Sequence, residues 1–150
     1  MNQTKAQADT LNEAGILTAL NFMGSWVCWG NYTAVYPIST DAKDMWLPIS
    51  RMFSWVGNTV IQTFWSKLDK PMTRRLIDTI MDTANIWLNG LTGSGYLLGG
   101  RVEFLADENT TADLMAGKLK FHVYLTPPGP AQEIEFVLEY DSDYLSVLAG

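Results

Sequence analysis

The spacing of apolar residues changes near residue 100, and this change limits the folds open to the chain. Between residues 48 and 93, apolar residues recur every three or four positions, the period of one face of an α-helix. From residue 101 onward they alternate with polar residues, the period of a half-buried strand. The sequence therefore predicts an α+β fold with two long helices packed on a mostly antiparallel small sheet.

The expected helices have recognisable ends. The first begins around Pro48, because proline is tolerated in the first turn of a helix. The second is expected to be capped by Asp69, to carry Pro71 in its first turn and to end at Gly93 and Gly95. Its apolar stripe consists of Met72, Leu76, Ile80, Trp87 and Leu91.

Several short apolar runs predict strands. The pair 16–20 and 26–29 is separated by Gly24 and Ser25, which indicates a hairpin. Further along, we expect strands over 102–106, 118–125 and 133–139, and a short helix over 110–116. The run Pro127-Pro128-Gly129-Pro130 separates the last strand from the one before it.

A chain of 150 residues is long enough for one domain with its own core. We expect residues 1–10 to be a disordered lead-in or a severed linker, 11–130 to form the core, and 131–150 to form a C-terminal strand or arm. The polar N-terminus has no signal-peptide pattern, and no apolar run approaches the ~18 residues that cross a bilayer. We therefore expect a cytosolic site of synthesis and no contact with a membrane.

Residues that could carry chemistry are few. A single cysteine, Cys28, and a single histidine, His122, cannot supply a zinc site, and no metal or cofactor is expected. Asp78 and Asp82 lie one helical turn apart, but Arg74 precedes Asp78 by four residues, so an ion pair on the helix surface explains them. We expect no enzyme; a small cytosolic enzyme stays the alternative if Asp78, Asp82 and His122 line one cleft.

Charge is distributed unevenly. With 10 basic against 16 acidic residues the net charge is −6, which argues against nucleic-acid binding because that requires a dense positive surface. Opposite local charges can orient a partner, although an ordinary solvated surface explains them equally well. The basic group comprises Lys67, Lys70, Arg74 and Arg75, with Asp69 its one acid, and the acidic group comprises Glu133, Glu135, Glu139, Asp141 and Asp143.

Five short segments, in one order, resemble a known family. They are residues 11–16 (LNEAGI), 29–31 (WGN), 69–73 (DKPMT), 96–98 (YLL) and 116–119 (AGKL). Together they resemble the C-terminal domain of the tail sheath protein of P2- and Mu-like contractile phages and related R-type bacteriocins, over residues 11–148. Two departures are Tyr32, where the family often has a basic residue, and the turn at 127–130.

The resemblance implies a structural protein of a virion tail, made in the bacterial host cytoplasm and used in DNA ejection. It implies an inner domain that lies beside the tail tube, with larger N-terminal domains elsewhere in the parent. The implied partners are copies of the chain in hexameric rings stacked helically, the tail tube protein, and the baseplate and tail terminator at the ends. A tube or baseplate protein is the alternative, but tube proteins build β-barrel rings, against which two long helices argue.

Two surfaces follow for that role. The resemblance implies that extended termini add strands to neighbouring sheets, and a C-terminal strand beyond a proline break suits such an exchange between subunits. The alternative is that this strand pairs within its own domain. The strand consists of Glu133, Ile134, Glu135, Phe136, Val137, Leu138 and Glu139. The possible tube contact consists of Lys67, Lys70, Arg74 and Arg75.

Overall fold

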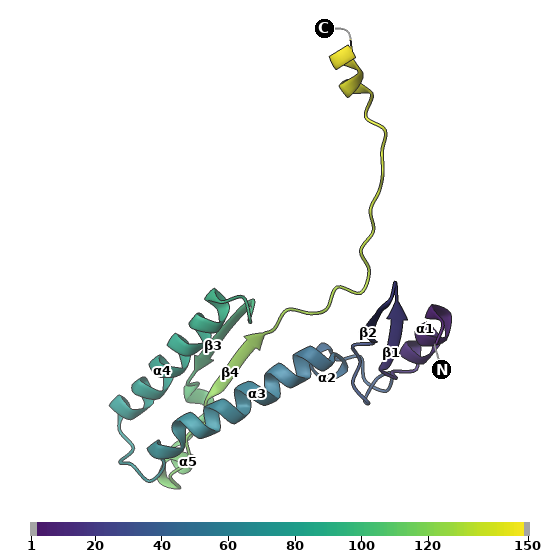
Figure 1. The fold of residues 1–150 in the computed structure, drawn as a ribbon. Coiled ribbons are helices and arrows are strands. Elements are labelled where there is room, and N and C mark those ends of the chain that lie inside the picture. Colours follow the sequence, from purple (N-terminus) through teal and green to yellow (C-terminus); the bar gives the residue numbers. More distant parts are fainter. Residues whose placement is uncertain (1–2, 149–150) are drawn as a thin grey trace.

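The computed structural model describes residues 3–148, which form three parts in chain order (Figure 1). An N-terminal unit of one helix and one hairpin leads into a body of two longer helices and a second pair of strands. An extended arm then leaves the body and ends in a short helical turn. Helices and small antiparallel sheets occur together, so the predicted α+β class is confirmed.

The N-terminal unit consists of α1 (Lys5–Glu13), β1 (Thr18–Phe22) and β2 (Ser25–Trp29). The two strands pair antiparallel, with Leu20 opposite Val27, so the predicted hairpin is confirmed. Leu20 is 2% exposed, and α1 contributes the buried Ala8. A side-chain hydrogen bond also joins helix and hairpin, since Trp29 Nε1 donates to Asp9 Oδ1 at 2.9 Å.

The prediction of a disordered lead-in is wrong for Lys5–Thr10, which belong to α1. A capping box starts this helix: the Thr4 hydroxyl accepts from the Gln7 N–H, and the Gln7 side chain accepts from the Thr4 N–H. A polar first turn therefore folds because its end is capped and because Ala8 packs inward. Residues 1–2 of the predicted lead-in lie outside the described residues.

The body begins with α2 (Ala42–Met45) and α3 (Leu47–Phe64), the latter with Pro48 in its first turn as predicted. A 3₁₀ turn, η1 (Trp65–Lys67), leads toward α4 (Arg74–Gly93). The predicted cap at Asp69 is wrong, because Asp69 has a φ of +59° whereas a cap needs extended backbone. Thr73 is extended and its hydroxyl accepts from the Leu76 N–H at 3.2 Å, so Thr73 caps α4.

The strands of the body are β3 (Gly99–Glu103) and β4 (His122–Thr126), which pair antiparallel with Val102 opposite Val123. Between them lie the turn η2 (Ala106–Glu108) and the predicted short helix, α5 (Thr111–Met115). The described chain has two separate two-stranded sheets, which corrects the expectation of one small sheet.

The buried Asn109 explains why β4 begins later than predicted. Its side chain accepts from the Lys120 N–H at 2.8 Å and donates to the Lys120 C=O at 3.0 Å. The backbone of Lys120 is thus paired with an amide side chain, and ladder pairing starts only at His122.

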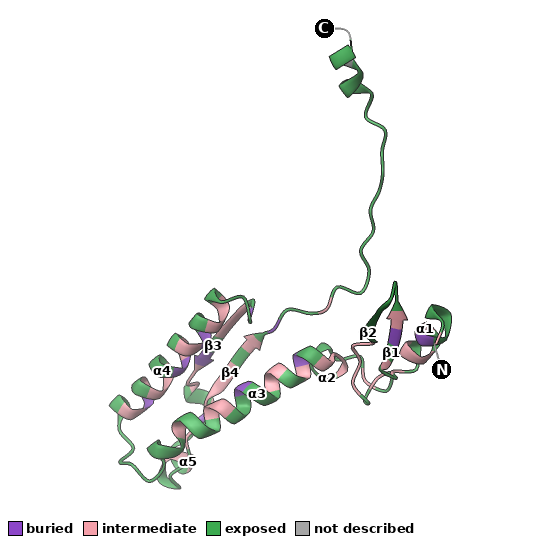
Figure 2. Ribbon diagram, viewed as in Figure 1, coloured by how far each residue is buried: buried purple, intermediate pink, exposed green. Residues whose placement is uncertain are grey.

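The core of the body lies where α4 packs along β3 (Figure 2). The Asn85 side chain joins these two elements, accepting from the Val102 N–H at 2.8 Å and donating to the Val102 C=O at 3.2 Å. The helix α3 reaches the same core through Met52 and Phe64 and contacts α4 through Trp55 and Trp87, whose rings are 5.6 Å apart. The buried cluster consists of Ala84, Leu88, Leu97 and Val102.

Beyond Thr126, the arm has no helix or strand until the 3₁₀ turn η3 (Ser142–Leu148). The strand predicted over 133–139 is therefore not formed within the described chain, because no other strand lies beside it. Within the described residues the segment is likewise not paired inside its own domain, the alternative named above. Residues 149–150 of the predicted arm lie outside the described residues.

We expect Asn85→Ala to destabilise the body markedly. The change leaves the N–H and C=O of Val102 without their partners, and an unsatisfied buried polar group costs about 1–3 kcal/mol. Urea unfolding measures the loss. The exposed Asn89 on the same helix gives the matched control Asn89→Ala; equal losses in both variants would contradict the role assigned to Asn85.

Candidate assembly surfaces

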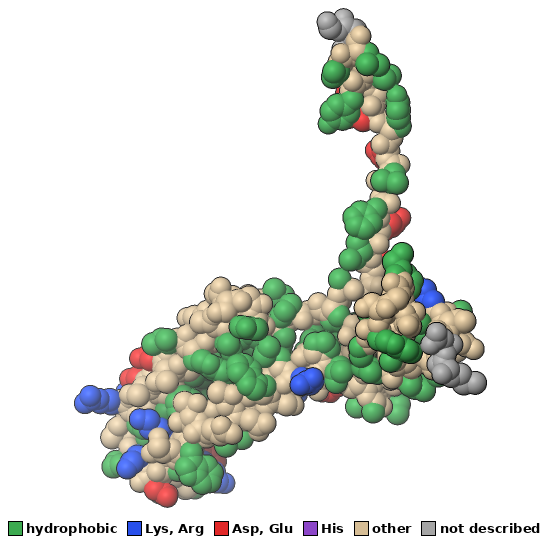
Figure 3. Space-filling view, viewed as in Figure 1, with side chains coloured by type: hydrophobic (Ala, Val, Ile, Leu, Met, Phe, Trp, Pro, Cys, Tyr) green, Lys and Arg blue, Asp and Glu red, His purple; other side chains and the backbone are tan. Residues whose placement is uncertain are grey.

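The arm exposes apolar side chains that a soluble chain normally buries. Ile134, Phe136 and Leu138 are 70%, 83% and 94% exposed, and they occupy alternate positions of an extended segment. Figure 3 shows such hydrophobic side chains along the arm, beyond the bulk of the molecule. Strand addition requires alternate apolar side chains on an extended backbone. The backbone forms hydrogen bonds with the edge of a sheet, and the side chains of one face fill pockets of the receiving protein.

The two sheets supply edges of the kind that an added strand needs. Each sheet has only two strands, so within the described residues each strand has one edge without a partner strand. An isolated pair of strands is marginally stable, and a third strand stabilises it. The chain therefore carries both an extended segment and sheet edges open to pairing.

An aromatic stack holds the base of the arm. The Tyr32 ring stacks on Tyr36 at 3.9 Å and on Trp46 at 5.0 Å, and the Tyr32 hydroxyl donates to Gln132 Oε1 at 3.1 Å. The adjacent Tyr32 hydroxyl, chiefly by its charge, raises the pKa of Tyr36. Tyr32 is one of the two departures noted in the sequence, and here it positions the start of the arm, a role that no sequence pattern predicted.

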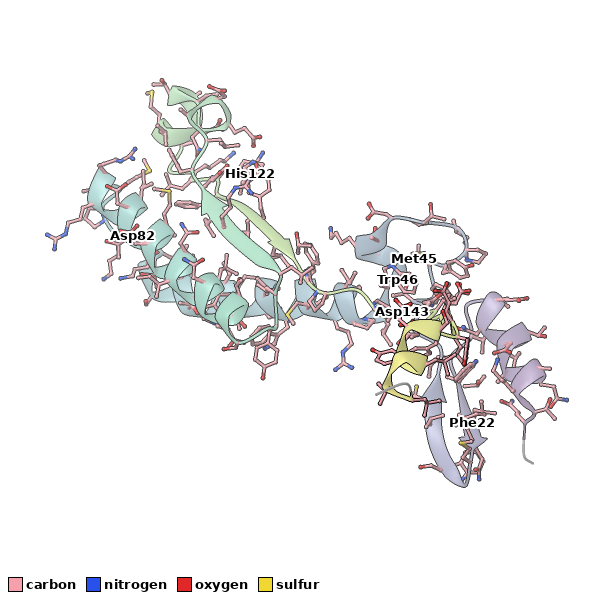
Figure 4. All side chains as sticks on the ribbon, turned by 90° about the horizontal axis from the view of Figure 1, so that it is seen from above. Phe22, Met45, Trp46, Asp82, His122 and Asp143 are labelled. Atoms are coloured by element: carbon pink, nitrogen blue, oxygen red, sulfur yellow. The ribbon has the colours of Figure 1, made fainter. Side chains whose placement is uncertain are left out.

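The hairpin presents a second exposed apolar surface. Phe22, Met23 and Trp26 are 50%, 92% and 60% exposed around the turn that joins β1 and β2, and Figure 4 marks Phe22 there. The sequence predicted the hairpin but not this exposure, because the apolar residues of β2 are consecutive and do not reveal an outer face.

The predicted basic cluster lies at one end of the body, where α3 ends and α4 begins. Figure 3 shows several Lys and Arg side chains at this end. One member is paired on the helix surface, as predicted, since Arg74 Nε lies 3.0 Å from Asp78 Oδ1. All four residues, Lys67, Lys70, Arg74 and Arg75, are exposed.

An apolar groove of about 850 Å³ opens beside this cluster. Its walls come from the end of α3, the start of α4 and the residues that lead into β4. Sequence patterns did not predict this groove. Leu68 and Leu119 lie outside the apolar stripes of the helices, and these two apolar residues were the available sign of it. The apolar lining comprises Val60, Phe64, Leu68, Pro71, Met72, Leu76, Ile80, Ala84, Val102, Leu119, Phe121 and Val123.

Asp78, Asp82 and His122, the residues of the enzyme alternative, lie on two different elements, α4 and β4. His122 Nε2 lies 2.6 Å from Glu108 Oε2, and Lys120 also pairs with Glu108; these two hydrogen bonds lower the pKa of the Glu108 carboxyl, with Lys120 the larger cause. Asp78 pairs with Arg74, and Asp82 lies exposed on α4, whereas His122 is on β4 (Figure 4). Among the described residues no three of His, Cys, Asp and Glu are grouped so as to hold a metal ion.

We expect the ion pairs of Glu108 to be lost in acid. The folded pKa of Glu108 lies below its unfolded value, so the stabilisation is present above the unfolded value and falls away as pH drops through the folded one. Because Glu108 and His122 are only partly buried and Lys120 is exposed, solvent screens the pairs and the effect on unfolding is small. Urea midpoints of the chain and of Glu108→Gln, measured from neutral pH into acid, should converge; a constant gap would contradict the linkage.

None of the helices in residues 3–148 combines the length and the apolar character needed to span a bilayer.

No protein-family model matches the chain. Three proteins are similar over most or all of it. The tail sheath protein of Burkholderia phage BcepMu is 30% identical over 152 aligned positions, covering 100% of this chain and 31% of that protein. The tail sheath protein of Escherichia phage P2 is 28% identical, covering 99% and 36%.

The third relative is a putative prophage major tail sheath protein of Pseudomonas aeruginosa strain UCBPP-PA14, 23% identical over 93% of this chain and 35% of that protein. Solved structures share the fold. A chain of the anti-feeding prophage baseplate superposes with a TM-score of 0.81 at 20% identity, covering 94% of this chain and 40% of that one. A chain of the sheath complex of an extracellular contractile injection system, in the contracted state, also gives 0.81, at 18% identity and with 96% and 42% covered.

The chain thus spans about a third of the length of the tail sheath proteins it matches. Its own sequence is matched almost from end to end, and the predicted resemblance is confirmed by the first two relatives. The chain is a homologue of one part of the phage tail sheath proteins.

Proposed function

We propose that this chain is a structural part of a contractile tail sheath and that it acts by associating with copies of itself around a tail tube. The observation that carries the proposal is the similarity of nearly the whole chain to tail sheath proteins. The free arm supports it, because a segment with exposed apolar side chains and unpaired backbone is suited to a neighbouring subunit.

The link between subunits is strand addition by Glu133–Glu139. Ile134, Phe136 and Leu138 lie on one face of the extended segment and would fill pockets of the neighbour, while the opposite face is mostly acidic. Ladder hydrogen bonds give the link its strength, and the side-chain period of two fixes its register. The acidic face also limits unspecific pairing between free arms.

At the level of the assembly, the proposal is of hexameric rings stacked helically on a tail tube, bounded by a baseplate and a tail terminator. Arms that cross from one subunit to the next would keep the lattice connected while it shortens and widens, and this movement would drive DNA ejection. The chain would be made in the cytoplasm of a bacterial host and would act in the virion tail.

The proposed tube contact is the basic cluster Lys67, Lys70, Arg74 and Arg75. These side chains are exposed at one end of the body. Long-range attraction by such a cluster speeds encounter and orients the partner more than it adds affinity.

Removal of the arm tests the link between subunits. We expect the full chain to form larger species at high concentration and the chain cut after Pro130 to remain monomeric, because the cut removes the whole added strand. Light scattering and electron microscopy measure this. Identical oligomeric states of the two proteins would refute strand exchange.

A pair of neighbouring substitutions tests the face that enters the pockets. Phe136→Glu places a charge among the apolar contacts and should weaken association about tenfold or more, which is about 1.4 kcal/mol. Val137→Glu is the matched control, because Val137 lies on the mostly acidic face, and should have a smaller effect. Sedimentation equilibrium gives both constants; equal weakening would contradict the assigned face.

Charge reversal tests the tube contact. Arg74→Glu with Arg75→Glu should weaken docking of the chain to a purified tail tube, and the loss should shrink as salt rises because screening already reduces the attraction. Arg51→Glu, an exposed arginine on α3, is the control. Co-sedimentation across a salt series reports binding, and unchanged docking of the double variant would remove the proposal.

A further inference from the structure

We infer that the apolar groove beside the basic cluster receives the C-terminal turn, residues 144–148, of a second copy. The inference rests on the proposed self-association and adds a second site to it. The arm of one subunit would then be held twice, by its strand at a sheet edge and by its last turn in the groove.

The groove is built for apolar side chains. Phe64 forms part of the wall from α3, Ile80 part of the wall from α4, and Phe121 part of the wall from the segment before β4. The lining also includes Ala84 and Val102, two members of the buried core, so the groove reaches the centre of the body. Its volume of about 850 Å³ is within the range of sites that enclose a ligand of several side chains.

The C-terminal turn has matching chemistry. Tyr144, Val147 and Leu148 are 76%, 76% and 83% exposed, and Leu145 is 48% exposed. These four apolar residues fall within one short 3₁₀ segment, Ser142–Leu148, so a single docking event would cover them together. The apolar area gained is the main source of affinity in such a contact.

The charges around the two surfaces are complementary. The lysines that line the groove are Lys67, Lys70 and Lys118, against one acid, Asp69. The residues that lead into the turn carry the opposite charge, at Glu139, Asp141 and Asp143. Attraction between them would orient the turn as it approaches. Arg74 and Arg75 do not line the groove, so they stay available for the proposed tube contact.

The arm is long enough to reach both sites. The groove borders β3 through Val102 and β4 through Val123, next to a sheet whose outer edges have no partner strand in the described chain. From Glu139 to Ser142, where the turn begins, an extended chain spans up to ~10 Å, so a strand added to this sheet leaves the turn within reach of the groove beside it. In Figure 1 the arm leads away from its own body, which favours a second copy as the source.

A labelled peptide of residues 139–148 tests the groove directly. The receiving protein is the full chain with Leu145→Asp and Leu148→Asp, so that its own turn does not compete. Fluorescence anisotropy should show saturable binding that weakens with salt, and Met72→Glu in the groove should weaken it tenfold or more. Met23→Glu, the same change at an exposed site outside the groove, should leave it unchanged. Absence of saturable binding, or equal binding by both variants, overturns the inference.

Disulfide trapping tests whether the contact is between copies. In a Cys28→Ser background, chains with Leu145→Cys are mixed under mild oxidation with size-tagged chains that carry Leu119→Cys. The yield of this mixed dimer should exceed the yield obtained when the size-tagged chains carry Met23→Cys in place of Leu119→Cys. A chain that carries both Leu145→Cys and Leu119→Cys should form mainly disulfide-linked dimers when it is oxidised at high protein concentration. Equal trapping at Met23→Cys, or closure only within one chain, overturns docking by a second copy.

The two proposals fail separately. Peptide binding reports the groove whether or not the chain assembles, whereas the cut after Pro130 reports the whole arm. If the cut abolishes association while the peptide does not bind, strand exchange stands and the groove inference is wrong. If the peptide binds while the cut changes nothing, the groove binds the turn, but both strand exchange and docking between copies are wrong, because the cut removes the strand and the turn together.

Discussion

Backbone hydrogen bonding that one chain does not complete by itself governs this structure. The described residues contain two sheets of two strands each and an extended segment, 133–139, with no strand beside it. A two-stranded sheet is marginal in water, and an unpaired extended segment gains nothing from its strand-like sequence. In the proposed strand exchange, an edge of another copy would pair with the segment and satisfy both, and association would then be part of folding.

The body has to stay rigid for such an exchange to transmit force. It is small, with a buried cluster of four residues where α4 packs along β3, and two amide side chains add hydrogen bonds between its elements. Asn85 joins α4 to the backbone of β3, and Asn109 joins the η2 turn to the segment before β4. Each amide pairs with both the N–H and the C=O of one residue, so it fixes position as well as distance. These two side chains hold the sheet edges where a neighbour can use them.

Sequence patterns predicted the parts of the fold that depend on local periodicity and failed where pairing decides the outcome. The hairpin, the helix that begins at Pro48 and the α+β class followed from spacing and turn residues. The alternation at 133–139 predicted a strand that the described chain does not form by itself, because alternation states which side chains share a face and not where the partner strand is. The cap of α4 was misplaced because Asp69 and Thr73 are both good capping residues, and only the left-handed backbone at Asp69 decides between them. No sequence pattern predicted the groove, because one wall comes from residues 60–84 and the rest from β3, β4 and the segment before β4, which are distant in sequence.

In the proposed assembly, the distribution of charge would limit uncontrolled association of free chains. Free arms that expose Phe136 and Leu138 would aggregate through these side chains if their other face were neutral. Glutamates at 133, 135 and 139 make two arms repel each other, while the basic end of the body attracts them. The same charges therefore disfavour pairing between arms and favour pairing of an arm with a body. In the proposed exchange this selectivity would depend on ionic strength mainly during encounter, because ladder hydrogen bonds and buried side chains would hold a paired strand, and salt screens these little.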